Sequence, residues 1–284
     1  MNHPYSAKAL KGKDEQWLLE EKYKGEKTPE YEADKKRLAS GEPLAYVIGY
    51  QPFLDLKIYL DSHPLIPRVE TEWWTEQMLQ EAVKACSLRG LHSATARGLS
   101  DFSAEKLRTP KGTCRTDVHR LLDLCAGSGA IGCAALAKLP NAQVYFGEID
   151  PAHEATILKN IRENHLDESR THICIGDLFE PFASMKFDII AANPPYVPSD
   201  RVLEKSVADY EPSHALFAGT DGLDLIRRIA TELSKHLAPG GEAWIEIDTP
   251  AAATAAGLFT AQGFVAEIRN DQYDKPRIVV VSFP

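Results

Sequence analysis

An asparagine, two prolines and a tyrosine follow an apolar stretch of the chain. Residues 189–192 are Ile-Ile-Ala-Ala, and Asn193, Pro194, Pro195 and Tyr196 come next. The Asn193 side-chain oxygen and the Pro194 carbonyl can each accept a hydrogen bond, while the prolines stiffen the backbone and remove competing N–H donors. Tyr196 offers an aromatic ring to a planar group. The four residues are therefore suited to holding an NH2 group in one orientation.

The chemistry that this clamp favours is group transfer to a weakly nucleophilic nitrogen. The lone pair of an amide nitrogen is delocalised into its carbonyl, so the rate must come from positioning and polarising the NH2 group. No general base is required, because water or Asn193 can relay the proton. The same clamp suits the exocyclic amine of adenine, so these residues alone leave the acceptor open.

A second segment, LLDLCAGSGAIG (121–132), has the pattern of a strand, a glycine turn and a helix start. Glycines in the turn permit a close approach of a ligand to the backbone, and the helix start offers free N–H groups. The spacing differs from G-x-G-x-x-G, so the turn alone does not identify the ligand. We expect the cofactor to contact the whole turn, which consists of Cys125, Ala126, Gly127, Ser128 and Gly129.

Acidic residues at the ends of the next two expected strands indicate a nucleoside. Glu148 lies 21 residues after Gly127, where a carboxylate can accept hydrogen bonds from both ribose hydroxyls, and Asp150 is the alternative. Asp177 ends the third strand and could accept from the exocyclic adenine amine, with Leu178 covering the ring. Because α/β sheets bind ligands beyond the carboxyl ends of their strands, we expect these side chains to converge.

This pattern of residues could bind either of two cofactors, NAD or S-adenosylmethionine. NAD enzymes usually carry another phosphate-binding glycine in the turn and a catalytic His or Lys, but Ala130 and Ile131 follow Gly129 and no such base is evident. Asp123, just before the turn, suits an ammonium-bearing ligand better than a pyrophosphate. These residues favour S-adenosylmethionine.

The elements that would position these residues alternate between strands and helices from residue 120 onward. The last expected helix, at 250–262, is followed by two strands with no helix between them, at 263–271 and 277–283. This order predicts an α/β fold, with a mainly parallel sheet covered on both faces and an antiparallel pair at its end.

The first part of the chain has a different character. Residues 1–45 are highly charged, with too few apolar residues for an independent core, and contain two expected short helices. The second helix has Thr28 as its N-cap and Pro29 at its first position. We expect this part to be a small helical segment that helps to dock a substrate.

The remaining chain divides into a linker and a catalytic domain. Residues 46–67 are expected to form a hairpin-like linker, with a strand at 53–60, and the domain spans 68–284. A helix is expected at 70–86. Residues 88–119 lack periodicity and are interpreted as a surface loop insertion.

Composition excludes several other classes of protein. The 284 residues carry a formal net charge of -9, which disfavours stable binding of nucleic acid. Apolar runs are too short for a membrane span, and the first residues have no apolar core for a secretory signal. Five cysteines without a CxxC pair predict neither a metal site nor disulfides. We expect a cytoplasmic monomer.

Longer segments resemble the HemK/PrmC family of protein-glutamine N5-methyltransferases. Besides LDLCAGSGAIG, GDLFEPF and NPPYVP, they are GEPLAYVIGYQPF (41–53), LIPRVETE (65–72), DYEPSHALFAGTDGLDLIRRI (209–229) and YDKPRIVVV. The resemblance implies a Rossmann-like, seven-stranded class I S-adenosylmethionine-dependent methyltransferase with a shortened helical N-terminal domain. It also implies a substrate, the glutamine of the Gly-Gly-Gln motif in peptide chain release factors.

The resemblance assigns roles to individual residues as well. Those expected to be catalytic are Asn193, Pro194 and Tyr196. Those expected to contact the substrate are Asn193, Pro194, Pro195, Tyr196 and Glu211. Thr71 and Asn193 would join the cofactor-binding residues, with Arg68 and Glu70 nearby. The alternatives are methylation of a ribosomal-protein glutamine, adenine-N6 methylation of DNA or RNA, and a scaffold that binds S-adenosylmethionine without catalysis.

Overall fold

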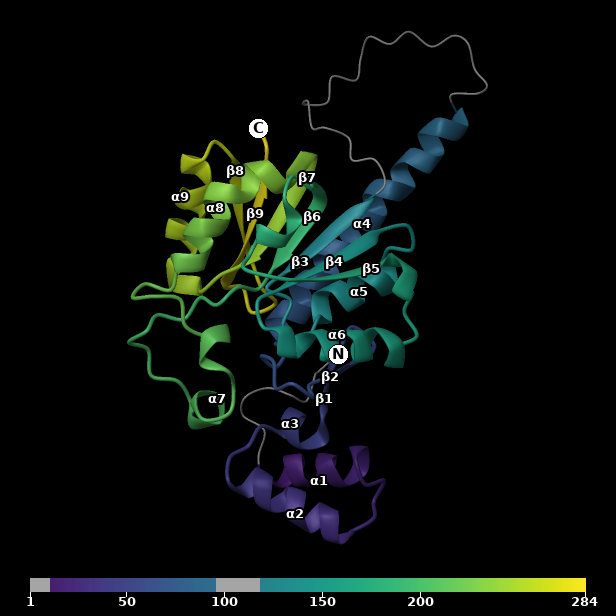
Figure 1. Cartoon of the computed structure of the whole chain (residues 1–284), viewed down its shortest axis with the longest axis vertical. Helices are drawn as coiled ribbons and strands as arrows, with labels where there is room; N and C mark the ends of the chain where they lie inside the picture. Colours follow the sequence, from purple (N-terminus) through teal and green to yellow (C-terminus); the bar gives the residue numbers. More distant parts are fainter. Residues whose placement is uncertain (1–10, 96–117) are drawn as a thin grey trace.

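A seven-stranded sheet forms the centre of the computed structural model, which describes residues 11–95 and 118–284 (Figure 1). The strand order is β5-β4-β3-β6-β7-β9-β8. The strands are β3 (Arg120–Leu124), β4 (Gln143–Glu148), β5 (Thr171–Ile175), β6 (Phe187–Ala192), β7 (Leu237–Glu246), β8 (Val265–Asn270) and β9 (Pro276–Ser282). The α/β fold predicted from the sequence is confirmed.

The sheet is parallel from β5 to β7, and β9 runs antiparallel to both of its neighbours. Its central strands are continuous apolar runs, as expected for strands buried on both faces. Leu121 of β3, for example, pairs with Ile189 of β6, and both are fully buried. The antiparallel pairing of the last two strands is confirmed. β7 begins at Leu237 and includes Pro239-Gly240-Gly241.

Helices cover both faces of the sheet (Figure 1). On one face lie α4 (Val69–Thr95), α5 (Ala130–Lys138) and α6 (Glu154–Glu163), which share a core with the sheet. On the other lie α8 (Asp224–His236) and α9 (Ala252–Ala261). The shorter elements are α7 (Lys205–Ala208) and the 3-10 turns η1 (Pro151–His153), η2 (Glu168–Arg170), η3 (Glu180–Phe182), η4 (Ser213–Ala215) and η5 (Thr249–Ala251).

Helix α4 is longer than the sequence suggested. It continues to Thr95, so the prediction of a loop from residue 88 is wrong for residues 88–95. Proline is absent from this stretch, and Gly90 costs only about 1 kcal/mol relative to alanine. The rest of the predicted insertion, residues 96–117, lies outside the described residues. Among the described helices, none is both long and apolar enough to cross a membrane.

The N-terminal helices are α1 (Lys11–Glu21), α2 (Pro29–Ala39) and α3 (Leu44–Ile48). Thr28 caps α2, and its hydroxyl oxygen accepts from the Tyr31 backbone N–H at 3.3 Å, as predicted. A small apolar cluster joins the three helices and is separate from the two cores at the sheet; its buried members are Leu18, Tyr31, Val47 and Ile48.

A β-hairpin connects these helices to the sheet domain. It consists of β1 (Tyr50–Phe53) and β2 (Leu56–Tyr59), so the single strand predicted at 53–60 is wrong. The chain reverses at Leu54 and Asp55, both with positive φ (46° and 66°), without the Asn-Gly or Asp-Gly pair that usually signals such a turn. The hairpin docks on α6, where Asn160 Oδ1 accepts from the Tyr59 N–H at 2.6 Å.

Candidate active site

The glycine turn follows β3 directly and leads into α5. Cys125, Gly127 and Gly129 have left-handed backbone conformations, with φ of 60°, 54° and 77°. A Cβ at Gly129 would lie 3.2 Å from atoms of Ile157 and Phe146, so the turn is packed tightly against α6 and β4. The main chain of the turn is therefore held in place, as a site for a closely approaching ligand requires.

Asp123 has an unusual environment at the base of the turn. Its Oδ2 accepts from the Gly132 N–H at 2.8 Å, whereas its Oδ1 is buried and has no hydrogen-bond partner among the described residues. Burial raises the pKa of Asp123 well above its usual value, against the lowering effect of the Gly132 N–H, and the charge of Glu148 raises it further. A buried, unpartnered carboxylate oxygen is costly, and a ligand with a cationic group would satisfy it.

Glu148 connects the end of β4 to the turn. Its Oε2 accepts from the Gly127 N–H at 2.7 Å, and its Oε1 accepts from the N–H groups of Ile149 and Asp150, each at 2.9 Å. A carboxylate offers about four acceptor positions, so capacity remains for a ligand hydroxyl. Asp150, the alternative, instead caps η1 through Ala152 N at 2.9 Å.

The third acidic position lies after β5. Asp177 Oδ2 pairs with Arg228 Nη2 of α8 at 2.8 Å, and both side chains are partly exposed. Leu178, next in the chain, is buried with a left-handed φ of 48°. Arg228 was not predicted as a site residue, because nothing in its local sequence connects α8 with the end of β5.

Asn193 and Tyr196 follow β6, and both are connected to Glu246 at the end of β7. Asn193 Nδ2 donates to Thr71 Oγ1 at 3.1 Å, and Thr71 Oγ1 donates to Glu246 Oε2 at 2.6 Å. Tyr196 OH donates to Glu246 Oε1 at 2.9 Å. Trp74 Nε1 also donates to Oε2, at 2.7 Å. One carboxylate therefore receives three side-chain hydrogen bonds.

Burial dominates the electrostatics of this group. Glu246 is 1% exposed, and burial raises its pKa although Thr71, Trp74 and Tyr196 all lower it. Burial also raises the pKa of Tyr196 well above its usual value, and Glu246 raises it further. Neither Glu246 nor Trp74 was predicted as a site residue from the sequence. The position of Glu246 at a strand's carboxyl end is the signal that could have revealed it.

Glu211 is buried and forms an ion pair with Arg68, which is 32% exposed and lies in the segment before α4. Its Oε1 accepts from Arg68 Nη2 at 2.6 Å, and its Oε2 accepts from the Ile66 N–H at 3.2 Å. Burial lowers the pKa of Arg68, but the charge and hydrogen bond of Glu211 outweigh this effect and the net shift is upward. Both oxygens of Glu211 thus bind residues of this segment, which connects the region after the clamp to the start of α4.

Gly222 brings the segment after the clamp against the clamp's own backbone. Its φ is 74°, and a Cβ at this position would lie 2.2 Å from the Tyr196 carbonyl oxygen. Only glycine permits this approach, so the TDGL turn supports the backbone at Tyr196.

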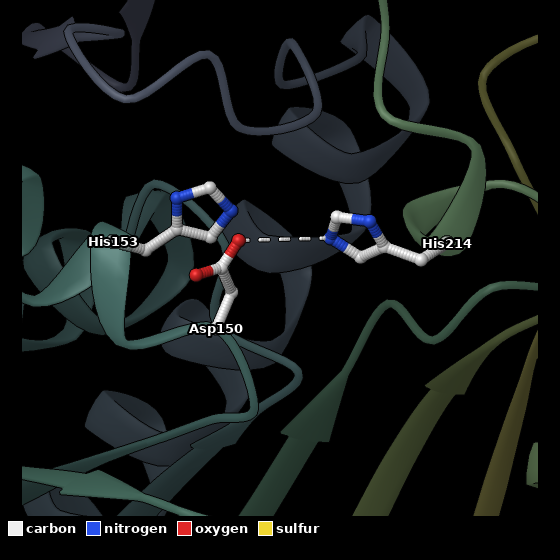
Figure 2. Close-up of side chains that lie close together, drawn as sticks. All are labelled: Asp150, His153 and His214. Carbon is white, nitrogen blue, oxygen red and sulfur yellow. Dashed lines mark ion pairs between the residues drawn. The ribbon is translucent and has the colours of Figure 1, made fainter.

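Asp150, His153 and His214 form a cluster beside the site, at the junction of β4, η1 and η4 (Figure 2). Asp150 Oδ2 and His214 Nε2 are 4.0 Å apart. Ligands at about 2.1 Å from one tetrahedral ion would be about 3.4 Å apart. His153 Nδ1 is also hydrogen-bonded to Ser62 Oγ, at 2.8 Å. We therefore interpret the cluster as a polar contact between η4 and β4 and assign no metal to it.

The sequence and the fold of this chain were compared with those of known proteins. The model of the methyltransferase small domain family matches residues 100–209. The crystal structure of the hMettl16 catalytic domain in complex with MAT2A 3'UTR hairpin 6 is 15% identical, with a TM-score of 0.53 over 81% of this chain and 76% of that one. This likeness concerns the fold alone, which is the Rossmann-like class I methyltransferase fold.

Curated relatives are more similar in sequence. The release factor glutamine methyltransferase of Geobacter sulfurreducens is 34% identical over 80% of this chain and 68% of the relative. That of Thermodesulfovibrio yellowstonii is 32% identical over 87% and 78%. The bifunctional methyltransferase of Rickettsia felis is 31% identical over 87% of this chain, which spans 46% of that longer protein. Because these identities extend over most of the chain, it belongs to the family of release factor glutamine methyltransferases.

Proposed function

We propose that this chain methylates the side-chain amide nitrogen of the glutamine in the Gly-Gly-Gln motif of peptide chain release factors, using S-adenosylmethionine, in the cytoplasm. One observation carries the proposal. Asn193 is anchored through its nitrogen to Thr71, while its Oδ1 accepts no hydrogen bond from the residues that the structure describes. An anchored side chain with a free acceptor is what an incoming NH2 group needs.

The residues around the turn fit S-adenosylmethionine. The unpartnered, buried Oδ1 of Asp123 suits the ammonium group, and the remaining capacity of Glu148 suits the ribose. When bound, the cofactor supplies an electrophilic methyl group on a positively charged sulfur. Asp177 and Leu178 would hold the adenine, and Asp177 would then exchange or share its contact with Arg228.

The clamp residues then act on the glutamine amide. Asn193 Oδ1 would accept a hydrogen bond from one N–H of the glutamine amide, and the Pro194 carbonyl would accept one from the other N–H. The two hydrogen bonds would fix the direction of the nitrogen lone pair. Pro194 and Pro195 keep the backbone rigid. The ring of Tyr196 would pack against the planar amide, with its hydroxyl held by Glu246 at 2.9 Å. The nitrogen loses its proton to water.

Labelled S-adenosylmethionine tests the proposal directly. The protein is incubated with the labelled cofactor and either a release factor or duplex DNA, and modified residues are located by mass spectrometry. Label is expected on the Gly-Gly-Gln glutamine, and a release factor with asparagine in place of this glutamine serves as the control. Label in DNA alone would show that the clamp serves adenine.

A glycine substitution tests the backbone support of the clamp. Gly222→Ala displaces the Tyr196 carbonyl, because the new Cβ would lie 2.2 Å from that oxygen. We expect turnover to fall by about 10-fold or more, since small misplacements at a reacting centre are costly. Gly257→Ala is the control: it lies in α9 with nothing within 4 Å of the new Cβ, so turnover should match the wild type. Equal turnover in both variants would remove this role from Gly222.

A further inference from the structure

We propose that Glu246 is a positioning residue that, through Thr71, determines which end of the Asn193 amide faces the substrate. The inference rests on the proposed function of Asn193 as a hydrogen-bond acceptor. In the described hydrogen bonds Glu246 contacts neither the glycine turn nor the Pro194 carbonyl, and its partners are Thr71, Trp74 and Tyr196.

The direction of each hydrogen bond follows from the chemistry of the groups. An ionised carboxylate only accepts, so Thr71 must donate its single hydroxyl proton to Glu246, at 2.6 Å. The Thr71 oxygen then retains acceptor capacity alone. Asn193 must therefore turn its NH2 group toward Thr71, at 3.1 Å, and its Oδ1 toward the opposite side. A charge two side chains away thus selects one of the two orientations of the amide.

The second catalytic side chain depends on the same carboxylate. Glu246 Oε1 accepts from the Tyr196 hydroxyl, whereas Oε2 accepts from Thr71 and Trp74. Strand pairing fixes Glu246 close to the clamp, because Ile245 of β7 lies opposite Ala192, the last residue of β6. Asn193 and Tyr196 are therefore positioned against one rigid point in the sheet.

These contacts also redefine the role of Thr71, which was expected to bind the cofactor. Thr71 is 3% exposed, and its hydroxyl both donates to Glu246 and accepts from Asn193. A cofactor contact would have to compete with these two bonds. The geometry makes Thr71 the connection between Glu246 and the clamp.

Paired substitutions at Thr71 separate the two roles. Thr71→Val keeps the shape but removes the hydroxyl, and Thr71→Ser restores it. For Thr71→Val we expect kcat to fall by about 10- to 100-fold, the scale typical when a residue that orients a functional side chain is lost. The dissociation constant of S-adenosylmethionine, measured by calorimetry, should stay at the wild-type value. Thr71→Ser should recover most of the turnover. A dissociation constant that rises in step with the loss of kcat would assign Thr71 to the cofactor and overturn the proposal.

Glu246→Gln tests the carboxylate itself. The carboxamide has one acceptor oxygen in place of two, so either Tyr196 or the Thr71–Trp74 side loses its acceptor, and kcat should fall at unchanged cofactor affinity. Glu242→Gln is the matched control, since Glu242 lies on the same strand and its Oε2 likewise accepts from a tryptophan, Trp244 Nε1, at 3.1 Å. Equal turnover in the two variants would contradict the role of Glu246.

A readout without substrate keeps this test independent of the proposed function. Hydrogen exchange of the Asn193 side-chain NH2, followed by NMR, should be slow in the wild type and in Thr71→Ser and faster in Thr71→Val. Equal exchange in all three would overturn the positioning role. If the wild type labels no glutamine but the three proteins show this exchange pattern, only the substrate assignment is refuted.

Discussion

Replacing Asn193 by alanine lowers turnover on the release factor by about 10²- to 10³-fold, the loss typical when one polar contact to a reacting group is removed. The substitution removes the acceptor of one glutamine N–H bond and leaves the Pro194 carbonyl alone to hold the NH2 group. The residues around Asp123 and Glu148 are unchanged, so cofactor affinity stays close to that of the wild type. Single-turnover kinetics and calorimetry measure the two effects separately.

A surface asparagine provides the control for this substitution. Asn270 lies on β8, away from the clamp, and its Nδ2 donates to Asp274 at 2.7 Å. Asn270→Ala should turn over as the wild type does. Asn193→Ala also loses its bond to Thr71, which costs about 1 kcal/mol of folding free energy, so thermal unfolding verifies that both variants are folded. Wild-type turnover in folded Asn193→Ala would refute the clamp.

The second large effect is expected at Asp123. Asp123→Asn keeps the acceptor for the Gly132 N–H but removes a buried negative charge whose Oδ1 is unpartnered. We expect the dissociation constant of S-adenosylmethionine to rise by about 10- to 100-fold, since a hydrogen bond to a charged group contributes about 1.5–3 kcal/mol. The cofactor-free variant should nevertheless unfold at a higher temperature than the wild type at neutral pH.

The raised pKa of Asp123 determines how the stability of the wild type changes with pH relative to Asp123→Asn. The pKa of Asp123 is raised in the folded protein, so the folded state holds the proton more tightly than the unfolded chain does. The wild type therefore loses stability as pH rises from the unfolded pKa, about 3.9, through the folded value, and Asp123→Asn does not. The difference in unfolding temperature should grow with pH across this window.

An exposed aspartate serves as the control for Asp123→Asn. The Asp55 side chain is 95% exposed, so Asp55→Asn should change neither cofactor affinity nor the pH dependence of unfolding. If Asp123→Asn bound the cofactor as tightly as the wild type and were less stable at every pH, Asp123 would have a purely structural role.

Local patterns in the sequence were sufficient for most elements of the fold. The alternation of apolar strands and helices predicted the α/β sheet, and Thr28 with Pro29 predicted the start of α2. A hairpin-like linker was expected at 46–67, but the position of its reversal, at Leu54 and Asp55, was missed, because neither residue is typical of a turn with two positive φ values. The extension of α4 was missed because residues 88–95 lack an apolar period, although they contain no proline.

Candidate site residues were recognised within single segments of the sequence, whereas contacts between distant elements were missed. The glycine turn and the clamp each lie within one segment, so their residue types could be recognised together. The contacts of Glu246 depend on β7 lying beside β6 and on α4 packing against the ends of both strands. Glu211 and Arg68 were both named from the sequence, but the ion pair between them, 143 residues apart in the chain, was not predicted. Such contacts depend on the strand order, which local periodicity does not contain.

The strand order has a consequence for the folding of the protein during its synthesis on the ribosome. β9 lies between β7 and β8, although both of these strands are synthesised before it. Until β9 emerges, β8 has no neighbour in the sheet and β7 keeps an open edge, a form of surface that favours aggregation. Glu246 pairs with Ile278 in the register of β7 and β9. The carboxylate that positions the clamp therefore reaches its final environment only when nearly the whole chain has been made.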